Sequence, residues 1–105
     1  MDKISVNEIL QVANGRLLSG DAGTLITGVR HDSRECGAGA LFVAVCGEKN
    51  DGHDYIESVI SSGAAAVMVS YEGPWLEKAR AEGTAVILVE NTVYAMGELA
   101  GYYLD

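Results

Sequence analysis

The chain has 105 residues, of which 49% are hydrophobic and 21% charged, and this length suits one domain with a single core. Its net charge of -8 and its seven scattered Lys and Arg residues argue against a nucleic-acid binder, which needs clustered cations. No apolar run is long enough to cross a membrane, and no targeting segment precedes the first elements, so we expect a cytoplasmic α/β domain.

The first 30 residues predict a helix followed by two strands. Ser5 and Glu8 have the spacing of a capping box, in which each side chain satisfies an unpaired amide at a helix start. Asn14-Gly15 is a typical helix end, because both residues tolerate the left-handed conformation. Residues 16–19 and 25–30 are short, partly apolar stretches and predict strands.

Leu41 to Val45 is a run of five apolar residues that predicts the core strand. It is too short for a helix, and its unbroken apolar character fits a strand buried on both faces. Polar loops precede and follow it, at residues 32–34 and 47–54, and we expect them to leave its opposite ends. Loops held by a rigid strand are the usual place for a binding site. Composition alone favours ordinary surface turns.

The rest of the chain alternates helices and strands. A helix from Asp54 to Gly63 and a strand over residues 64–69 complete a βαβ unit with the core strand, so the two strands should be parallel. A helix over residues 75–82 and a strand over residues 85–89 follow.

Asn91 or Thr92 should cap the last helix. Gly97 and Gly101, four residues apart in it, indicate either close packing of this helix or simple tolerance of glycine. Its expected inward stripe is Met96, Leu99, Ala100 and Tyr103.

These elements predict a three-layer α/β fold with a mostly parallel or mixed sheet of about five strands. The helices that begin near Ser5, Asp54 and Thr92 should cover the sheet. Their outer positions are largely polar or small and form no heptad seam, so we expect a monomer.

No catalytic constellation is evident, because the chain has no phosphate-binding loop, dinucleotide fingerprint, nucleophile elbow or zinc-protease motif. Cys36 and Cys46 form no CxxC pair, and Cys46 should be a small buried hydrophobe. His31 and Asp32 would diverge on a strand, so we expect no metal site. In His53-Asp54 we expect the Asp to cap a helix and the His to bond loop backbone.

Ser33 and Arg34 allow two interpretations. In the structural one, Asp32 and Arg34 bond to loop amides and to neighbouring charges, and so hold an irregular connection. In the functional one, Ser33 and the amides of residues 47–50 bond the edge of a planar polar ligand such as a nucleobase. The residues alone do not choose between them.

The strings Gly28-Val29-Arg30-His31-Asp32-Ser33-Arg34 and Gly47-Glu48-Lys49-Asn50-Asp51-Gly52-His53-Asp54 closely resemble the N-terminal domain of the Mur ligases, as does Gly63 to Val67. These ATP-dependent amide ligases build the peptidoglycan stem peptide. The chain looks most like the member that adds D-alanyl-D-alanine to UDP-N-acetylmuramoyl-tripeptide. The member that adds the third residue, diaminopimelate or lysine, is the alternative, and a stand-alone acidic interaction module is another.

The resemblance implies that this domain binds the UDP moiety of a UDP-N-acetylmuramoyl-peptide. It also implies that the family's phosphate-binding loop begins shortly beyond the residue matching Asp105. We therefore expect the first domain of a three-domain enzyme, inactive alone, with ATP and magnesium held by the remaining domains of the same chain. The substrate-binding residues carried over are Ser33, Arg34, Gly47, Glu48, Lys49 and Asn50.

Overall fold

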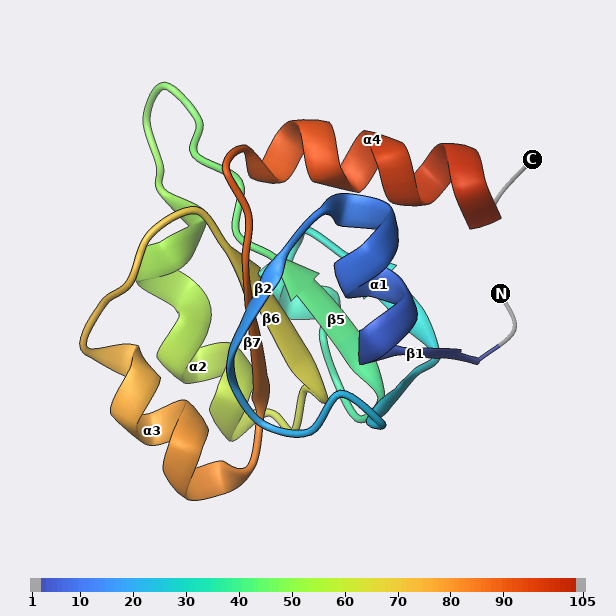
Figure 1. Ribbon diagram of the computed structural model, residues 1–105. Helices are drawn as coiled ribbons and strands as arrows, with labels where there is room; N and C mark the ends of the chain where they lie inside the picture. Colours follow the sequence, from blue (N-terminus) through green and yellow to red (C-terminus); the bar gives the residue numbers. More distant parts are fainter. Residues whose placement is uncertain (1–2, 104–105) are drawn as a thin grey trace.

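Five short strands form one mixed sheet at the centre of the computed structural model, which describes residues 3–103 (Figure 1). Only the first of the strands below runs antiparallel to its neighbour, and the other four are parallel to one another. In spatial order they are β2 (Arg16–Ser19), β7 (Ala85–Leu88), β6 (Ala66–Val69), β5 (Ala40–Val43) and β4 (Gly28–Arg30).

Helices cover both faces of this sheet, which confirms the predicted three-layer α/β fold (Figure 1). One face packs against α1 (Val6–Ala13) and α4 (Thr92–Tyr103), and the other against α2 (Ile56–Ser61) and α3 (Trp75–Glu82). None of the helices in the described residues has the length and apolar character needed to cross a membrane.

The predicted capping box is present at the start of α1. The Glu8 amide donates to the Ser5 hydroxyl at 3.1 Å, and the Ser5 amide donates to the Glu8 carboxylate at 3.3 Å. Asn14 ends the helix in the left-handed conformation, at φ 54°. The short strand β1 (Ile4–Ser5) leads directly into this cap.

The strand predicted over residues 25–30 is broken into two pieces. β3 (Leu25–Ile26) pairs with β1 in a separate two-stranded sheet, whereas β4 pairs with β5 in the main sheet. Thr27 lies at the break, and its amide donates to the carbonyl of Gly39 at 2.8 Å. The chain changes partners at this residue, which a continuous sequence pattern does not reveal.

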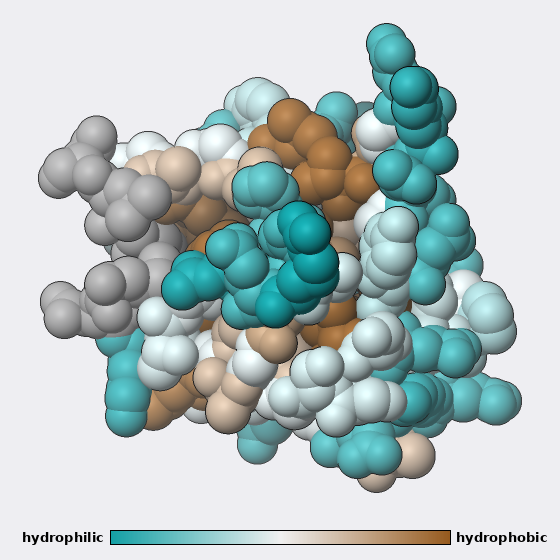
Figure 2. Space-filling model, turned by 180° about the vertical axis from the view of Figure 1, so that it is seen from behind, coloured by the Kyte–Doolittle hydropathy of each residue, from teal (hydrophilic) through white to brown (hydrophobic). Residues whose placement is uncertain are grey.

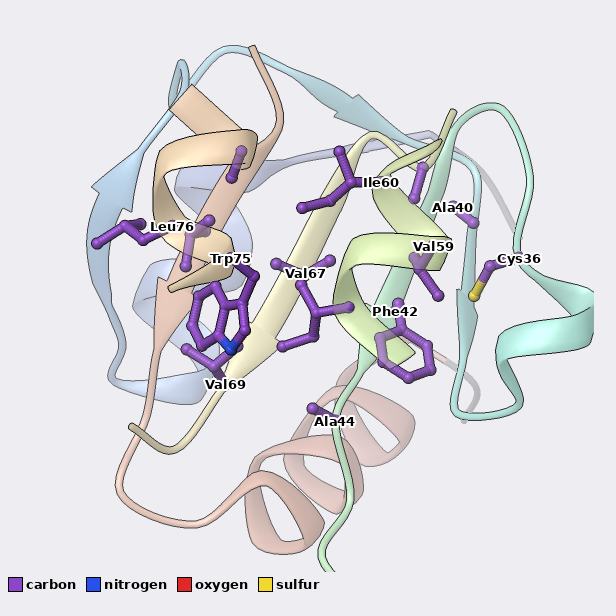
Figure 3. Packing of buried hydrophobic residues seen from close by; sticks show 14 residues of the cluster. Cys36, Ala40, Phe42, Ala44, Val59, Ile60, Val67, Val69, Trp75 and Leu76 are labelled. Carbon is purple, nitrogen blue, oxygen red and sulfur yellow. The ribbon is translucent and has the colours of Figure 1, made fainter. Parts of the chain in front are cut away.

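The predicted core strand is confirmed as β5 and is fully buried, although it runs from Ala40 to Val43 rather than from Leu41 to Val45. Alternate residues point to opposite helix layers, as the pleat requires. Phe42 packs with Val67 beneath α2 and α3, where Trp75 closes the cluster (Figure 3). Leu41 packs on the other side of the sheet, under α1 and α4.

The last helix differs from its prediction on the inward face. The Asn91 side chain caps it by accepting from the Tyr94 amide at 3.0 Å, as expected. Ala95 and Leu99 are its buried apolar residues, whereas Ala100 is exposed. The expected Tyr103 side chain lies outside the described part.

The interpretation that Gly97 and Gly101 allow close packing of α4 is wrong for the part of the chain that the structure describes. A Cβ added at either position would meet no atom within 4 Å. The two glycines face open space on α4, so the alternative interpretation, simple tolerance of glycine, fits the structure.

Candidate functional site

The two polar loops lie at the same edge of the sheet, which corrects the expectation that they leave opposite ends of β5. The first follows β4 and the second follows β5, and these strands are parallel in register from Gly28 opposite Ala40. Ligands of open α/β sheets bind outside the carboxyl ends of the strands. The loops enclose a surface pocket of about 520 Å³, lined by His31, Asp32, Ser33, Arg34, Val45, Asn50, Gly52 and Tyr55.

Three of the sequence-predicted residues meet in this pocket: Ser33, Arg34 and Asn50. The other three, Gly47, Glu48 and Lys49, are exposed in the same loop as Asn50 but do not line the pocket.

Tyr55 is a pocket residue that the sequence analysis missed. It belongs to a 3-10 turn, η2 (Gly52–Tyr55), that enters α2, and it is 42% exposed. Its aromatic side chain directly after the polar segment 51–54 was the available signal, because an exposed aromatic ring at a loop is a common contact surface for planar ligands. The pocket therefore combines a hydroxyl, an amide and an aromatic ring.

Asp32 and Arg34 hold the first loop together. Asp32 caps a 3-10 turn, η1 (Ser33–Glu35), by accepting from the Arg34 amide at 2.9 Å. The Arg34 guanidinium also donates to both Asp32 oxygens, from Nε at 3.0 Å and from the terminal nitrogen at 2.7 Å. These hydrogen bonds lower the pKa of Asp32 to about 2. The structural interpretation of Asp32 and Arg34 is therefore compatible with a ligand-binding role for the Ser33 side chain.

The second loop is closed at its base and projects from the body of the molecule (Figure 1). Cys46 and Asp51 form an isolated antiparallel bridge, and the Gly47 amide donates to the Asn50 carbonyl at 2.7 Å. The tip is hydrophilic and stands clear of the apolar surface (Figure 2). The loop is therefore a narrow turn that presents Asn50 beside the first loop.

Asp51, not Asp54, caps the turn that begins α2. Its Oδ1 accepts from the His53 amide at 2.9 Å and from His53 Nδ1 at 2.6 Å, and its Oδ2 accepts from the Tyr71 hydroxyl. Burial alone raises the pKa of Asp51, but hydrogen bonds from Tyr71 and His53 outweigh it and hold the pKa well below its usual range. The same hydrogen bond raises the pKa of Tyr71 to about 12.

His53 is buried and, as expected, bonds to loop backbone. Its Nε2 accepts from the Ser70 amide at 3.0 Å. Since Nε2 is an acceptor, the neutral ring carries its proton on Nδ1 and donates it to Asp51. Tyr71 stacks on the imidazole, with ring centroids 3.9 Å apart.

Cys46 is exposed, so the expectation of a small buried hydrophobe is wrong. Its thiol donates to Asp51 at 3.3 Å. This hydrogen bond, together with some loss of solvation by neighbouring atoms, raises the thiol pKa. A raised pKa disfavours the nucleophilic thiolate.

Cys46, Asp51 and His53 bring one sulfur, one oxygen and one nitrogen within 4.8 Å of one another, a spacing that suits a metal ion. The histidine tautomer argues against that use. A metal on Nδ1 would leave Nε2 either protonated against the Ser70 N–H or as an imidazolate. The group is better explained as a hydrogen-bonded network.

A larger groove of about 780 Å³ lies between α1 and α4. It is lined by residues of two helices, including Val12, Tyr94 and Gly97, and not by the ends of the parallel strands. The pocket between the loops is therefore the better candidate, since it gathers convergent polar groups at the carboxyl edge of the sheet.

Comparison with known proteins shows the family of the chain. The model for the Mur ligase family, catalytic domain, matches residues 25–103, which is more than half of the chain. The chain belongs to the Mur ligase family. The matched residues include both loops and the four parallel strands of the sheet, β4, β5, β6 and β7.

Two kinds of Mur ligase resemble the chain to the same degree. The UDP-N-acetylmuramoyl-tripeptide--D-alanyl-D-alanine ligase of Bacillus subtilis is 35% identical over 106 residues, covering 100% of this chain and 22% of that protein. The UDP-N-acetylmuramoyl-L-alanyl-D-glutamate--2,6-diaminopimelate ligase of Bacteroides thetaiotaomicron is 35% identical over 95 residues, covering 90% and 19%. This chain thus spans about a fifth of these Mur ligases.

A solved structure shares the fold. MurF from Acinetobacter baumannii superposes with a TM-score of 0.83 over 97% of this chain and 21% of that protein, at 23% identity. The mixed sheet with helices on both faces is therefore a Mur ligase architecture.

Proposed function

We propose that the chain is the N-terminal domain of a peptidoglycan-synthesis ligase and binds the UDP moiety of a UDP-N-acetylmuramoyl-peptide. The observation that carries this proposal is the meeting of Ser33, Asn50 and Tyr55 around one pocket at the carboxyl edge of β4 and β5. The chain's membership of the Mur ligase family supports the choice of a UDP-linked substrate.

The chemistry of these three side chains suits a uracil ring. A hydroxyl and an amide both donate and accept hydrogen bonds, and uracil offers carbonyl acceptors and one N–H donor along its edge. The Tyr55 ring offers a face for stacking, which contributes about 1–3 kcal/mol per base where measured by alanine substitution.

The diphosphate gains less from this domain. Arg34 is committed to Asp32 through two side-chain hydrogen bonds, and the chain as a whole carries a net charge of -8. We therefore expect the uridine to supply most of the binding, and the affinity of this chain for UDP to be weak and to depend on salt.

The D-alanyl-D-alanine ligase is our preferred assignment, because the Asn14-Gly15-Arg16-Leu17 helix end, the polar loop and the start of α4 all resemble that member. The equal identity to a diaminopimelate ligase favours the third-residue ligase as the second candidate. In either case we propose a cytoplasmic enzyme whose other domains hold ATP and magnesium, because the chain spans only about a fifth of the Mur ligases that it resembles.

An NMR titration of the folded chain with UDP tests the binding proposal. We expect amide shifts confined to residues 31–34 and 45–55. In Ser33→Ala the dissociation constant for UDP should be several-fold larger. Ser19→Ala is the matched control, because Ser19 lies in β2, the outermost strand on the side of the sheet away from β4. Absence of shifts at millimolar UDP, or equal shifts with ADP, would contradict the assignment of a uridine pocket.

The choice of ligase is tested with the longest reading frame that contains this sequence. The purified product, given ATP and magnesium, should join D-alanyl-D-alanine to UDP-N-acetylmuramoyl-tripeptide. Addition of diaminopimelate or lysine to the dipeptide substrate instead would establish the second candidate. The 105-residue chain should catalyse neither reaction.

A further inference from the structure

We propose that Asp51 is a positioning residue for nucleotide binding, which ties the loop carrying Asn50 to the end of β6 through His53 and Tyr71. This inference rests on the proposed function of the neighbouring pocket. Asp51 does not line that pocket, so its effect on a ligand would be exerted through the residue next to it in the chain.

The loop needs such an anchor because its tip has little support. Residues 47–50 are exposed, and two backbone hydrogen bonds close the base of the loop, from the Gly47 amide to the Asn50 carbonyl and from the Gly52 amide to the Val45 carbonyl. Asp51 joins the base of this loop to the segment that follows β6, because the Tyr71 hydroxyl in that segment donates to Asp51 Oδ2.

His53 supplies the second connection to the same segment. It is 3% exposed and accepts from the Ser70 amide while donating to Asp51 Oδ1 at 2.6 Å. Tyr71 stacks on it with an angle of 18° between the rings. Two consecutive residues after β6 thus fix the orientation of the carboxylate that ends the loop.

The network requires a carboxylate rather than an amide. Asp51 accepts hydrogen bonds from the backbone and ring of His53, from the Cys46 thiol and from the Tyr71 hydroxyl, and a carboxylate is an acceptor at both oxygens. An asparagine would place an NH2 group against one of these donors. The depressed pKa of Asp51 agrees with this arrangement.

The test compares UDP binding and stability in Asp51→Asn, Tyr71→Phe and a remote control. Tyr71→Phe keeps the ring that stacks on His53 and removes only its hydroxyl, so it should fold. Ser5→Ala is the control, because it removes a helix cap at α1 and so lowers stability without touching either loop.

We expect the dissociation constant for UDP to rise about fivefold or more in Asp51→Asn and about twofold in Tyr71→Phe, and to be unchanged in Ser5→Ala. Without ligand, the amide resonances of residues 47–50 should shift or broaden in Asp51→Asn. The ring nitrogen spectrum of His53 should lose its single tautomer in the same variant.

The outcomes separate the two proposals. If the unmodified chain fails to bind UDP, the proposed function fails and the positioning role falls with it. If the unmodified chain binds UDP but the folded Asp51→Asn and Tyr71→Phe variants bind equally well, only the positioning role is overturned. Should Asp51→Asn fail to fold, Tyr71→Phe decides: an unchanged dissociation constant would assign Asp51 to stability alone.

Discussion

The amide of Gly52 donates a hydrogen bond to the carbonyl of Val45 at 2.9 Å, and this close approach leaves no room for a side chain at position 52. A Cβ there would lie 2.6 Å from the Val45 nitrogen and 3.0 Å from backbone atoms of Ala44. Glycine is therefore required by the crossing of two backbone segments, because backbone atoms cannot move aside as a flexible side chain can.

Gly52→Ala should destabilise the chain by about 1–3 kcal/mol, the usual range for overpacking a closed site. Urea unfolding followed by circular dichroism measures the difference. Because the substitution lies at the base of the 46–51 loop, the UDP affinity should fall as well. An unchanged free energy of unfolding would show that the loop base relaxes freely.

Gly97→Ala should stabilise the chain, in contrast to Gly52→Ala. Gly97 lies inside α4 and an added Cβ meets no atom within 4 Å. Alanine is favoured over glycine in a helix interior by about 0.5–1 kcal/mol, mainly because glycine loses more backbone freedom on folding. The same urea titration gives the sign, and a loss of stability would indicate a contact that the described chain does not show.

The hydrogen bond between Tyr71 and Asp51 should make stability depend on alkaline pH. The pKa of Tyr71 is raised from 10.0 to about 12 by its hydrogen bond to Asp51, so the folded state favours the protonated phenol. The resulting stabilisation is fully present below pH 10 and is lost as the pH rises through about 12.

The difference in unfolding free energy between the unmodified chain and Tyr71→Phe reports this bond. It should be constant from pH 7 to about pH 9.5 and shrink between pH 10 and 12. The comparison cancels the titration of the other tyrosines. A difference that stays constant to pH 12 would mean that the hydroxyl contributes nothing specific to the folded state.

The pairing of Asp32 with Arg34 should be visible in the titration of one carboxyl group. The pKa of Asp32 is lowered from 3.8 to about 2 by hydrogen bonds from Arg34, so its stabilising effect is present above pH 4 and lost as the pH falls through 2. In Arg34→Ala, NMR titration of the Asp32 carboxyl should give a raised pKa that stays below 3.8, because the backbone amide of residue 34 still donates to this carboxylate. High salt should have a similar but smaller effect, because the pair is exposed.

Local sequence chemistry determined much of this fold. The Ser5 and Glu8 cap, the Asn14 helix end and the α3 helix follow from side chains within a few residues of one another. The apolar runs at β5, β6 and β7 predicted strands buried on both faces, because only a sheet covered by two helix layers removes such runs from water. The family resemblance also came from these contiguous strings.

The candidate site could be predicted only in part. Ser33, Arg34 and Asn50 were named because the polar loops that contain them resemble the Mur ligase strings, and the structure brings all three to one pocket. Tyr55 was missed because an aromatic residue at the start of a helix normally indicates core, and its position after the polar segment 51–54 was not weighed against that; the folded chain leaves it exposed. Cys46 was misplaced for the opposite reason, since it directly continues an apolar run.

What the sequence determined by itself was the approximate positions of the main-sheet strands and of the four helices, and the two polar loops, because those depend on neighbours along the chain. What only the tertiary structure decided was which loops meet. β4 and β5 are parallel, so their carboxyl ends lie at the same end of the sheet. Ser33 follows β4 and Asn50 follows β5, and the two residues therefore meet there. The bonds from Ser70 and Tyr71 to the His53–Asp51 pair likewise depend on β6 lying beside β5, a pairing between residues far apart in the sequence.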